Sequence, residues 1–472
     1  MSKDVDQHLI TRRRVAWLVA ACYFMEGLDG TIVTTAGPKL REALNTSVSA
    51  IGAVMSLYLV TFAVVIPLGG WLATRIGTKR LMLSAIAIFT IASLGCAMSP
   101  NITILLLARI VQGIGAALMV PVGRLAVLRD AKKTDLIRLI SYIVWPGLLA
   151  PALAPFVGGV LVTYASWQWL FLINVPLGVL ALVVGLRIVP RDEPQTSAPA
   201  SLDVLGMLLT SIGLGGLVYG AFQAGVLNAS WAPAVLVSAV SLLVLALSSW
   251  HLLGRSDPYI DLRVLRIMSL RHSLGAMAVF ILPVSALPLL LPLEFQDDFR
   301  WSPVKSGLLV LAIFVGNIAA KLTTNPLIRK LGHRHMLLLA STGVTASLVI
   351  ISYLKADISV VVIALVLFFS GAFRSIGFTG FMTLLFADVE ESELGHANTL
   401  VATVQQVFSG LALAGAVIAL RLGSLFSSLN LPTTLAYQDA LLLLAACALV
   451  VVVMVLRFSP NVGASLSASR DN

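Results

Sequence analysis

Two carboxylates stand near the middle of the first apolar run of the chain, residues 15–37. Glu26 lies eleven residues beyond Val15, which places it roughly 16 Å along a helix and near the midplane of a bilayer. Asp29 follows three residues later, on the same helix face. Two neighbouring carboxylates in a low-dielectric site resist double ionisation, so one of them should bind a proton readily. The spacing therefore predicts a proton-binding site.

A buried cation is expected at a similar depth. Asp29 lies about 13 Å from the outer end of its run, and Arg109 lies about 10 Å from the same edge in the run 102–127. These runs should be helices of opposite direction, so the two side chains are predicted to form an ion pair. Two roles remain open: Glu26, Asp29 and Arg109 all take part in proton coupling, or the ion pair is a fixed bridge and Glu26 alone titrates.

The composition shows what kind of protein must position these groups. The chain has 472 residues, of which 58% are hydrophobic and only 11% charged. Soluble domains average about 25% charged residues, so a soluble enzyme is excluded, and disorder would need low hydrophobicity. The net charge of +10 is interpreted as an excess of basic residues in cytoplasmic loops, and nucleic acid is not expected as a partner. The lipid bilayer is the expected environment of an all-α integral membrane protein.

The apolar runs predict fourteen membrane-spanning helices joined by short loops. Of the 32 basic residues, 22 fall on one side, six on the other and four within spans. This bias predicts a multi-pass protein with both termini in the cytoplasm. The expected spans are residues 15–37, 48–72, 81–98, 102–127, 138–163, 167–188, 204–224, 232–253, 271–293, 304–324, 336–354, 358–382, 398–424 and 437–457.

Two short basic loops indicate an internal repeat. One turns on Gly77 after the second run, and the other turns on Gly332 after the tenth. A tight turn between helices needs a residue that tolerates positive φ, and glycine does. If the loops are equivalent, two six-helix halves enclose two extra helices. The predicted domains are a six-helix bundle at 1–190, an inserted helix pair at 191–266 and a second six-helix bundle at 267–472, an arrangement typical of transporters.

The energy source follows from what the sequence lacks. It contains no G-x-x-x-x-G-K-[ST] motif, so a phosphate-binding loop for ATP is not expected. Cysteine spacing indicates neither a metal site nor a disulfide framework. We therefore expect a transporter rather than an enzyme, with no cofactor and with a proton gradient as its energy source.

Several stretches carry motifs. Residues 28–38 read L-D-G-T-I-V-T-T-A-G-P, residues 105–117 contain L-x-x-x-R-x-x-Q-G-x-G-A-A, and residues 166–178 read S-W-Q-W-L-F-L-I-N-V-P-L-G. Over its whole length the chain resembles the fourteen-helix drug:proton antiporters of the major facilitator superfamily, the EmrB/QacA-type branch. The resemblance implies the major facilitator fold, a place in the bacterial inner membrane and a role for Arg109 in proton coupling. It also implies conformational roles for Gly70, Arg75, Gly77, Lys79, Gln112, Gly113, Gly115, Pro155, Gly158 and Gly159.

Some positions depart from the family pattern. Thr74 stands where the loop motif usually has Asp, and Ala150 and Ala154 stand where the fifth-helix antiporter motif usually has Gly. The inner lock that the Asp is thought to form must therefore differ here. The added methyl groups should stiffen the fifth helix and fill its groove.

The substrate cavity is expected to be lined by residues of three kinds within the spans. They are the aromatic residues Tyr58, Trp145 and Phe378, the amides Asn317, Gln405 and Gln406, and the cations Lys321 and Arg374. Arg124, about 33 Å from the outer edge, is expected to snorkel at the inner interface.

These residues leave the substrate open. The first interpretation is proton-coupled export of lipophilic, often cationic drugs. The alternative is export of a small organic anion or a metal–organic-acid chelate through Arg374, and a proton symporter is less favoured. A sensor on a transporter scaffold should carry a soluble domain, for which the short loops leave no room. The expected partners are lipid, protons and a small molecule, with accessory efflux components as an open alternative.

Overall fold

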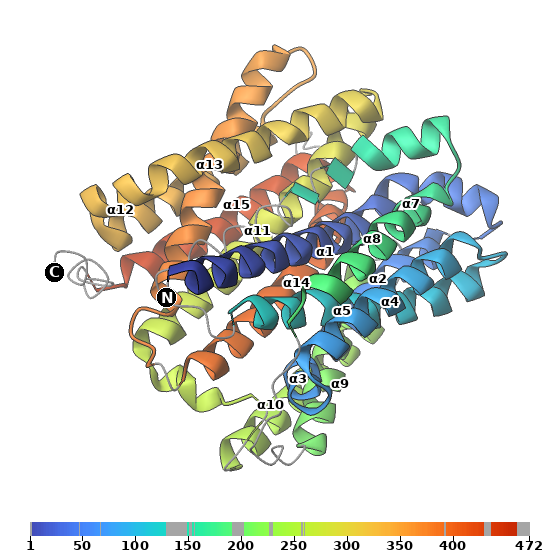
Figure 1. Cartoon of the computed structure of the whole chain (residues 1–472). Helices are drawn as coiled ribbons and strands as arrows, with labels where there is room; N and C mark the ends of the chain where they lie inside the picture. Colours follow the sequence, from blue (N-terminus) through green and yellow to red (C-terminus); the bar gives the residue numbers. More distant parts are fainter. Residues whose placement is uncertain are drawn as a thin grey trace. The chain divides into compact units, whose positions relative to one another are not determined.

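The computed structural model describes residues 2–46, 48–66, 68–128, 149–150, 153–154, 156–190, 203–225, 230–255, 258, 260–390, 393–428 and 436–459. Within this part of the chain every regular element is a helix (Figure 1). Backbone groups inside a bilayer must be satisfied within the protein, which long apolar runs achieve as helices. The elements that carry the first half are α1 (Ser2–Ala43), α2 (Val48–Val65), α3 (Leu68–Ile76), α4 (Thr78–Ala97), α5 (Ile102–Leu128), α7 (Trp169–Leu172) and α8 (Asn174–Ile188).

The remaining elements follow in order. They are α9 (Val204–Gly225), α10 (Trp231–Gly254), η1 (Leu262–Arg266), α11 (Met268–Asp297), α12 (Pro303–Ser352), α13 (Val360–Leu385), α14 (Leu394–Ser428) and α15 (Ala436–Leu456).

Twelve helices in the described residues are long and apolar enough to cross a membrane. They correspond to twelve of the fourteen expected spans. The expected span 48–72 is instead two helices, α2 and α3, and the sequence places Pro67 between them, where a proline disfavours helix at the residue before it. The expected span 138–163 lies largely outside the described residues. The count of fourteen therefore stays a prediction.

The chain divides into two compact units. The first comprises Met1–Tyr219, Val240–His251 and Arg255–Tyr259, and the second comprises Gly220–Ala239, Leu252–Gly254 and Ile260–Asn472. The boundary thus runs through α9 and α10 rather than between complete helices. The predicted division at 190 and 266 into three domains remains a prediction.

In the first unit α5 is the central helix and packs against α1, α2 and α4 (Figure 1). Glycines allow this close packing. A Cβ atom built on Gly115 would lie 2.6 Å from the backbone nitrogen of Phe89 in α4, and one built on Gly113 would lie 2.9 Å from the Tyr58 carbonyl oxygen in α2. Phe89, Tyr58 and Ala116 are buried in the same hydrophobic core. The side chains on α5 are therefore held in a fixed relation to α2 and α4.

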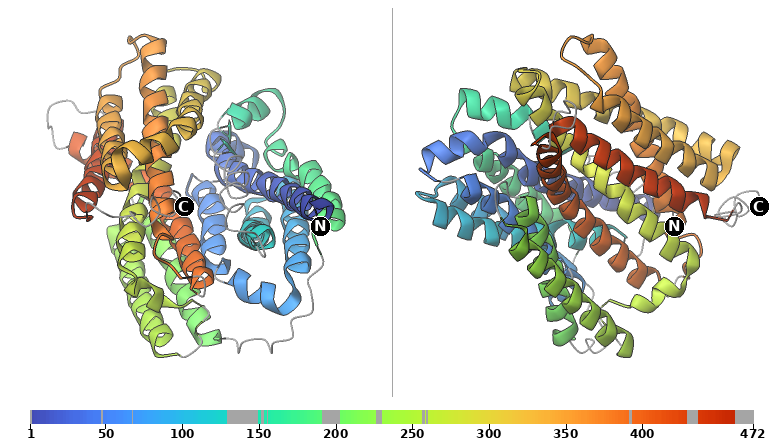
Figure 2. Two further views of the ribbon diagram at one scale, coloured as in Figure 1. Left: turned by 60° about the vertical axis from the view of Figure 1, so that its left-hand side comes forward. Right: turned by 180° about the vertical axis from the view of Figure 1, so that it is seen from behind.

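In the second unit α12 packs along α13 and α15, and α11 packs against α14 and α15 (Figure 2, yellow to red). The helix α12 is broken at Gly332, which has φ of 73°. Gly77, between α3 and α4, has φ of 88°. The predicted positive φ at both loop glycines is confirmed.

The two loops also share a capping contact. The Lys79 ammonium donates hydrogen bonds to the carbonyls of Leu186 (3.1 Å) and Val189 (2.6 Å) at the end of α8. In the second unit Arg334 Nη2 donates to the Leu456 carbonyl at the end of α15, at 2.8 Å. In each unit a basic residue two positions after the glycine thus caps a helix C-terminus, where unpaired carbonyls and the helix dipole favour a cation. This parallel supports the internal repeat.

Candidate functional site

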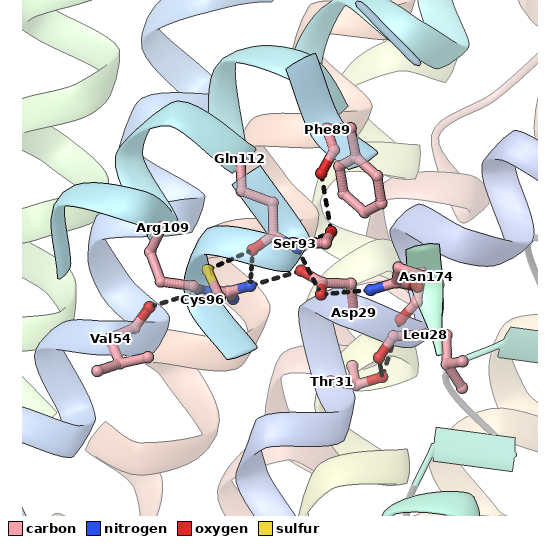
Figure 3. Close-up of polar contacts among 11 residues, drawn as sticks. Leu28, Asp29, Thr31, Val54, Phe89, Ser93, Cys96, Arg109, Gln112 and Asn174 are labelled. Carbon is pink, nitrogen blue, oxygen red and sulfur yellow. Dashed lines mark hydrogen bonds and ion pairs between the residues drawn. The ribbon is translucent and has the colours of Figure 1, made fainter. Parts of the chain in front are cut away.

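Asp29 is the centre of a buried polar network in the first unit (Figure 3). Its side chain is fully buried and accepts hydrogen bonds from three nitrogen donors. Arg109 Nη1 lies 2.5 Å from Oδ2, and Gln112 Nε2 and Asn174 Nδ2 each lie 2.9 Å from Oδ1. The predicted Asp29–Arg109 ion pair is confirmed. Helices α1, α5 and α8 each contribute side chains to this network, so the network joins three helices.

Arg109 also contacts groups beyond the ion pair, although its Nη2 has no hydrogen-bond partner. The residue is fully buried, and its Nε donates to the Val54 carbonyl in α2 at 3.2 Å. Its Cζ lies 4.1 Å from the ring centroid of Tyr58 and 5.7 Å from that of Phe171. Aromatic faces attract a guanidinium through the ring quadrupole. Tyr58, expected in the substrate cavity, is thus 2% exposed and packs on the cation of this network.

Gln112 links the ion pair to α4. Its Oε1 accepts a hydrogen bond from Arg109 Nη1 at 2.7 Å, and its Nε2 donates to Ser93 Oγ at 2.8 Å. The Ser93 hydroxyl in turn donates to the Phe89 carbonyl, and the Cys96 thiol lies 3.5 Å from Gln112 Oε1 (Figure 3). Both oxygens of Asp29 are paired, whereas Arg109 Nη2 and Asn174 Oδ1 are buried without a hydrogen-bond partner. Breaking one of the bonds to Asp29 would leave a further buried group unsatisfied. This favours the interpretation of Asp29–Arg109 as a fixed bridge.

Glu26, one turn before Asp29, has the opposite environment. The residue is 7% exposed, and its Oε2 is buried without a hydrogen-bond partner. The positive charge of Arg124 and the negative charge of Asp29 act on it in opposite directions, and Arg124 forms no ion pair with it within 4.0 Å. An isolated buried carboxylate is costly unless it is neutralised. Glu26 is therefore the acid of this region that can change its protonation without breaking the network.

Arg124, expected to snorkel at the inner interface, has a charge that acts on Glu26. It is half-buried on α5, and its Nε is buried without a hydrogen-bond partner. Side chains of a helix point toward its N-terminus, so Arg124 extends away from the inner end of α5 and into range of Glu26 and Tyr23. The charge of Arg124 is therefore part of the electrostatic environment of Glu26. The position of Arg124 along the helix did not by itself indicate this.

The predicted cavity residues of the second unit are spread over three helices. Asn317 is buried on α12, while Lys321 and, on α13, Arg374 and Phe378 are half-buried. Arg374 Cζ lies 5.7 Å from the ring centroid of Phe314, and its Nη1 is buried without a hydrogen-bond partner.

The two glutamines lie on α14 and are half-buried. The amide of Gln405 lies 3.8 Å from the Met277 sulfur and 3.9 Å from the Met382 sulfur. These are weak contacts, so the amide is held mainly by packing. Trp145 lies outside the described residues, as does Pro155 of the predicted conformational set.

The other conformational candidates occupy varied positions. Gly158 and Gly159 are buried, Gly70 faces open space, and the exposed Arg75 lies with its Cζ 5.6 Å from the Trp71 ring centroid. Thr74, the departure from the loop motif, donates a hydrogen bond to the Trp71 carbonyl at 2.7 Å. It therefore makes a local contact where the family has a charge.

Two network members were not predicted as site residues. Asn174 lies in the motif at 166–178, and its asparagine within an apolar run was an available signal. Ser93 carried no signal, because a serine in a membrane helix more often bonds its own backbone. No group of three His, Cys, Asp or Glu side chains that could hold a metal ion occurs in the described residues.

The fold and the site define a helical multi-span membrane protein of the transporter type, in which buried ionisable groups link the spans. The family model of the Major Facilitator Superfamily matches residues 19–204, 203–413 and 273–471. The chain belongs to the Major Facilitator Superfamily.

Bacterial relatives are similar over most of the chain. A protein of Klebsiella pneumoniae, named provisionally as multidrug resistance protein MdtD, is 32% identical over 86% of this chain and 86% of its own length. The protein of the same name from Serratia proteamaculans is 32% identical over 85% of this chain and 84% of its own. One from Escherichia coli is 31% identical over 89% and 88%. These relatives support a place among bacterial inner-membrane proteins.

Two solved structures share the fold. The human organic anion transporter MFSD10 (TETRAN) has a TM-score of 0.63 and 15% identity, and covers 94% of this chain and 99% of its own. A mutant of the nucleoside transporter NupG has a TM-score of 0.57 and 12% identity, with the same coverage. At these identities the likeness shows the fold alone.

Proposed function

We propose that this chain is a proton-coupled antiporter that exports lipophilic drugs, cationic ones among them, from the cytoplasm by alternating access. The names of the MdtD relatives support multidrug efflux. The observation that carries the coupling is the contrast between two acids one turn apart: Asp29 is paired with three donors, whereas a Glu26 oxygen is buried without a partner. Glu26 is then the proton carrier, and Asp29–Arg109 is the bridge that keeps its helix in place.

Coupling follows from the charge around Glu26. With a proton bound, the buried side chain is neutral and adds no charge beside Asp29. When the proton leaves, a second negative charge is created in a low-dielectric region, which favours either a cationic drug or a conformation that admits water. A proton and a cationic drug then compete for the same charge, as exchange requires. In the expected orientation, with both termini in the cytoplasm, protons enter from outside as the drug leaves.

The test is proton release on drug binding. Ethidium added to the purified protein in weakly buffered detergent should release protons from the native chain and none from Glu26→Gln. Glu42→Gln is the matched control, because Glu42 is an exposed acid near the end of the same helix. It should release protons as the native chain does.

Two results would contradict the proposal separately. Unchanged proton release from Glu26→Gln would show that Glu26 is not the coupling group. If proteoliposomes of the native chain accumulate no ethidium or other lipophilic drug under a pH gradient, the antiport function itself is wrong.

A further inference from the structure

Arg374 is a cation in the middle of α13 whose charge is not matched by an acid. Its Nη1 is buried without a hydrogen-bond partner, and its Cζ lies 5.7 Å from the Phe314 ring centroid. Among the described residues no carboxylate lies within 4.0 Å of it. An unpaired buried charge is costly, so a group that remains charged there needs an anion.

The internal repeat relates Arg374 to Arg109. Tyr58 and Ile313 are 255 residues apart, as are Gly77 and Gly332. A Cβ atom on Gly113 would meet the Tyr58 carbonyl, and one on Gly371 would meet the Ile313 carbonyl. The same close helix crossing therefore occurs in both units.

The two arginines lie on one face relative to this crossing. Arg109 precedes Gly113 by four residues, and Arg374 follows Gly371 by three. Once the glycines are superimposed, seven residues separate the arginines, which is close to two helical turns. Both guanidinium groups lie near an aromatic ring, Tyr58 in one unit and Phe314 in the other.

The two units differ in whether a carboxylate pairs with the arginine. In the first unit α1 supplies Asp29 to Arg109. The residue 255 positions after Asp29 is Val284 on α11, a buried apolar side chain. The second unit thus keeps the arginine and its ring but has an apolar side chain at the position of the acid; the buried acid of α11, Glu294, lies ten residues further along the helix.

Further polar groups share the face of α12 that carries Phe314. Asn317 and Lys321 follow it by three and seven residues, the spacing of one helix face. Asn317 is buried and Lys321 half-buried. This face therefore adds an amide and a second cation and no acid.

We propose that Arg374, with Lys321 and Asn317, binds the acidic group of an exported molecule, a carboxylate or another oxyanion on a lipophilic body. The inference rests on the proposed export function and extends its substrates to zwitterions and organic anions. A guanidinium suits this role because it is permanently charged and can bind a carboxylate through two parallel hydrogen bonds. The Phe314 ring provides an apolar wall beside it. An anionic lipid headgroup has the same chemistry, and the experiment separates the two sources.

The experiment compares 1-pyrenebutyrate with its uncharged methyl ester in binding to the purified full-length protein in nanodiscs of phosphatidylcholine. The native chain should bind the acid roughly ten- to hundredfold more tightly than the ester, as expected for a hydrogen-bonded charge pair. Arg374→Gln should remove this preference while leaving ester binding unchanged, which also reports a folded protein. Arg374→Lys should retain part of it. Lys355→Gln, an exposed basic residue of the same unit, is the matched control and should behave as the native chain.

Three results would overturn the inference: equal binding of acid and ester by the native chain, an undiminished acid preference in Arg374→Gln, or loss of the preference when phosphatidylglycerol is added to the nanodiscs. The last would assign the site to a lipid headgroup.

Binding needs no proton gradient, so the proposed antiport function and the proposed anion site can fail separately. Failed ethidium antiport with Arg374-dependent binding intact rejects only the proposed function, and normal antiport with Arg374-independent binding rejects only this inference.

Discussion

Asp29 and Arg109 form a fully buried ion pair between α1 and α5, with Oδ2 and Nη1 2.5 Å apart. Neither group can lose its partner without leaving the other charge uncompensated in the core. The second interpretation of the sequence, a fixed bridge beside a titrating Glu26, is therefore favoured by the geometry. The roles of the three residues in transport stay a proposal until they are tested.

The bridge predicts a large and non-additive loss of stability. Asp29→Asn should lower the free energy of unfolding by about 3–5 kcal/mol, because it leaves Arg109 buried and unpaired. Adding Arg109→Gln should cost less than the sum of the two single variants, since the unpaired charge is then gone. Chemical unfolding in detergent followed by tryptophan fluorescence measures this. Strictly additive effects would mean that the pair does not act as a unit.

Substitutions of Asn174 are expected to cause a smaller loss of stability, whose size depends on the charge of the new side chain. Asn174→Ala removes one donor from Asp29 and should cost about 1–3 kcal/mol. Asn174→Asp places a second carboxylate beside Asp29, so it should be less stable than the alanine variant at neutral pH and should recover in acid. Melting temperatures of both variants over a pH series provide the measurement. The prediction fails if Asn174→Asp melts as the native chain does at neutral pH.

The sequence predicted some of this arrangement for clear physical reasons. Twelve of its apolar runs correspond to long helices, because a bilayer imposes both length and backbone pairing. The Asp29–Arg109 pair followed from counting depth along two antiparallel helices. The contacts of Ser93 and Asn174 depend on how each helix is rotated, which packing decides. Depth alone also did not indicate that the Arg124 charge acts on Glu26, because the direction of the side chain along α5 was not considered.

The close contact of α4 with α5 predicts a sharp size limit at Gly115. A Cβ atom there would lie 2.6 Å from a backbone nitrogen of α4, so Gly115→Ala should destabilise the protein by about 1–3 kcal/mol or more. Gly70→Ala is the control, because no atom lies within 4 Å of its Cβ position. It should be neutral or stabilising by up to about 1 kcal/mol. Equal effects of the two variants on melting temperature would contradict the packing of α4 on α5.

Replacing Asp298, in the loop after α11, is expected to change the melting temperature in a pH-dependent way. Burial and the neighbouring Asp297 raise the pKa of this carboxyl, while Arg300 opposes the shift. A folded-state pKa above the unfolded value means that the charged form destabilises the fold at neutral pH. This cost decreases as the pH falls below the folded pKa and is gone once the pH is below the unfolded pKa. Asp298→Asn should therefore melt above the native chain at about pH 8 and approach it near about pH 4. A difference that does not change with pH would exclude this origin.

The capping contacts test the internal repeat itself. Lys79→Ala removes a cation from the end of α8, and Arg334→Ala removes one from the end of α15. A cation at a helix C-terminus contributes about 0.3–2 kcal/mol, so each variant should lose stability in this range. If the loops are equivalent, the two losses should be similar.

Each loss of stability should be largely restored by the conservative change, Lys79→Arg or Arg334→Lys. Arg80→Ala, an exposed neighbour in the first loop, is the control and should have little effect. A loss at one loop alone, measured as a shift in the unfolding midpoint, would show that the loops resemble each other in sequence without sharing a structural role.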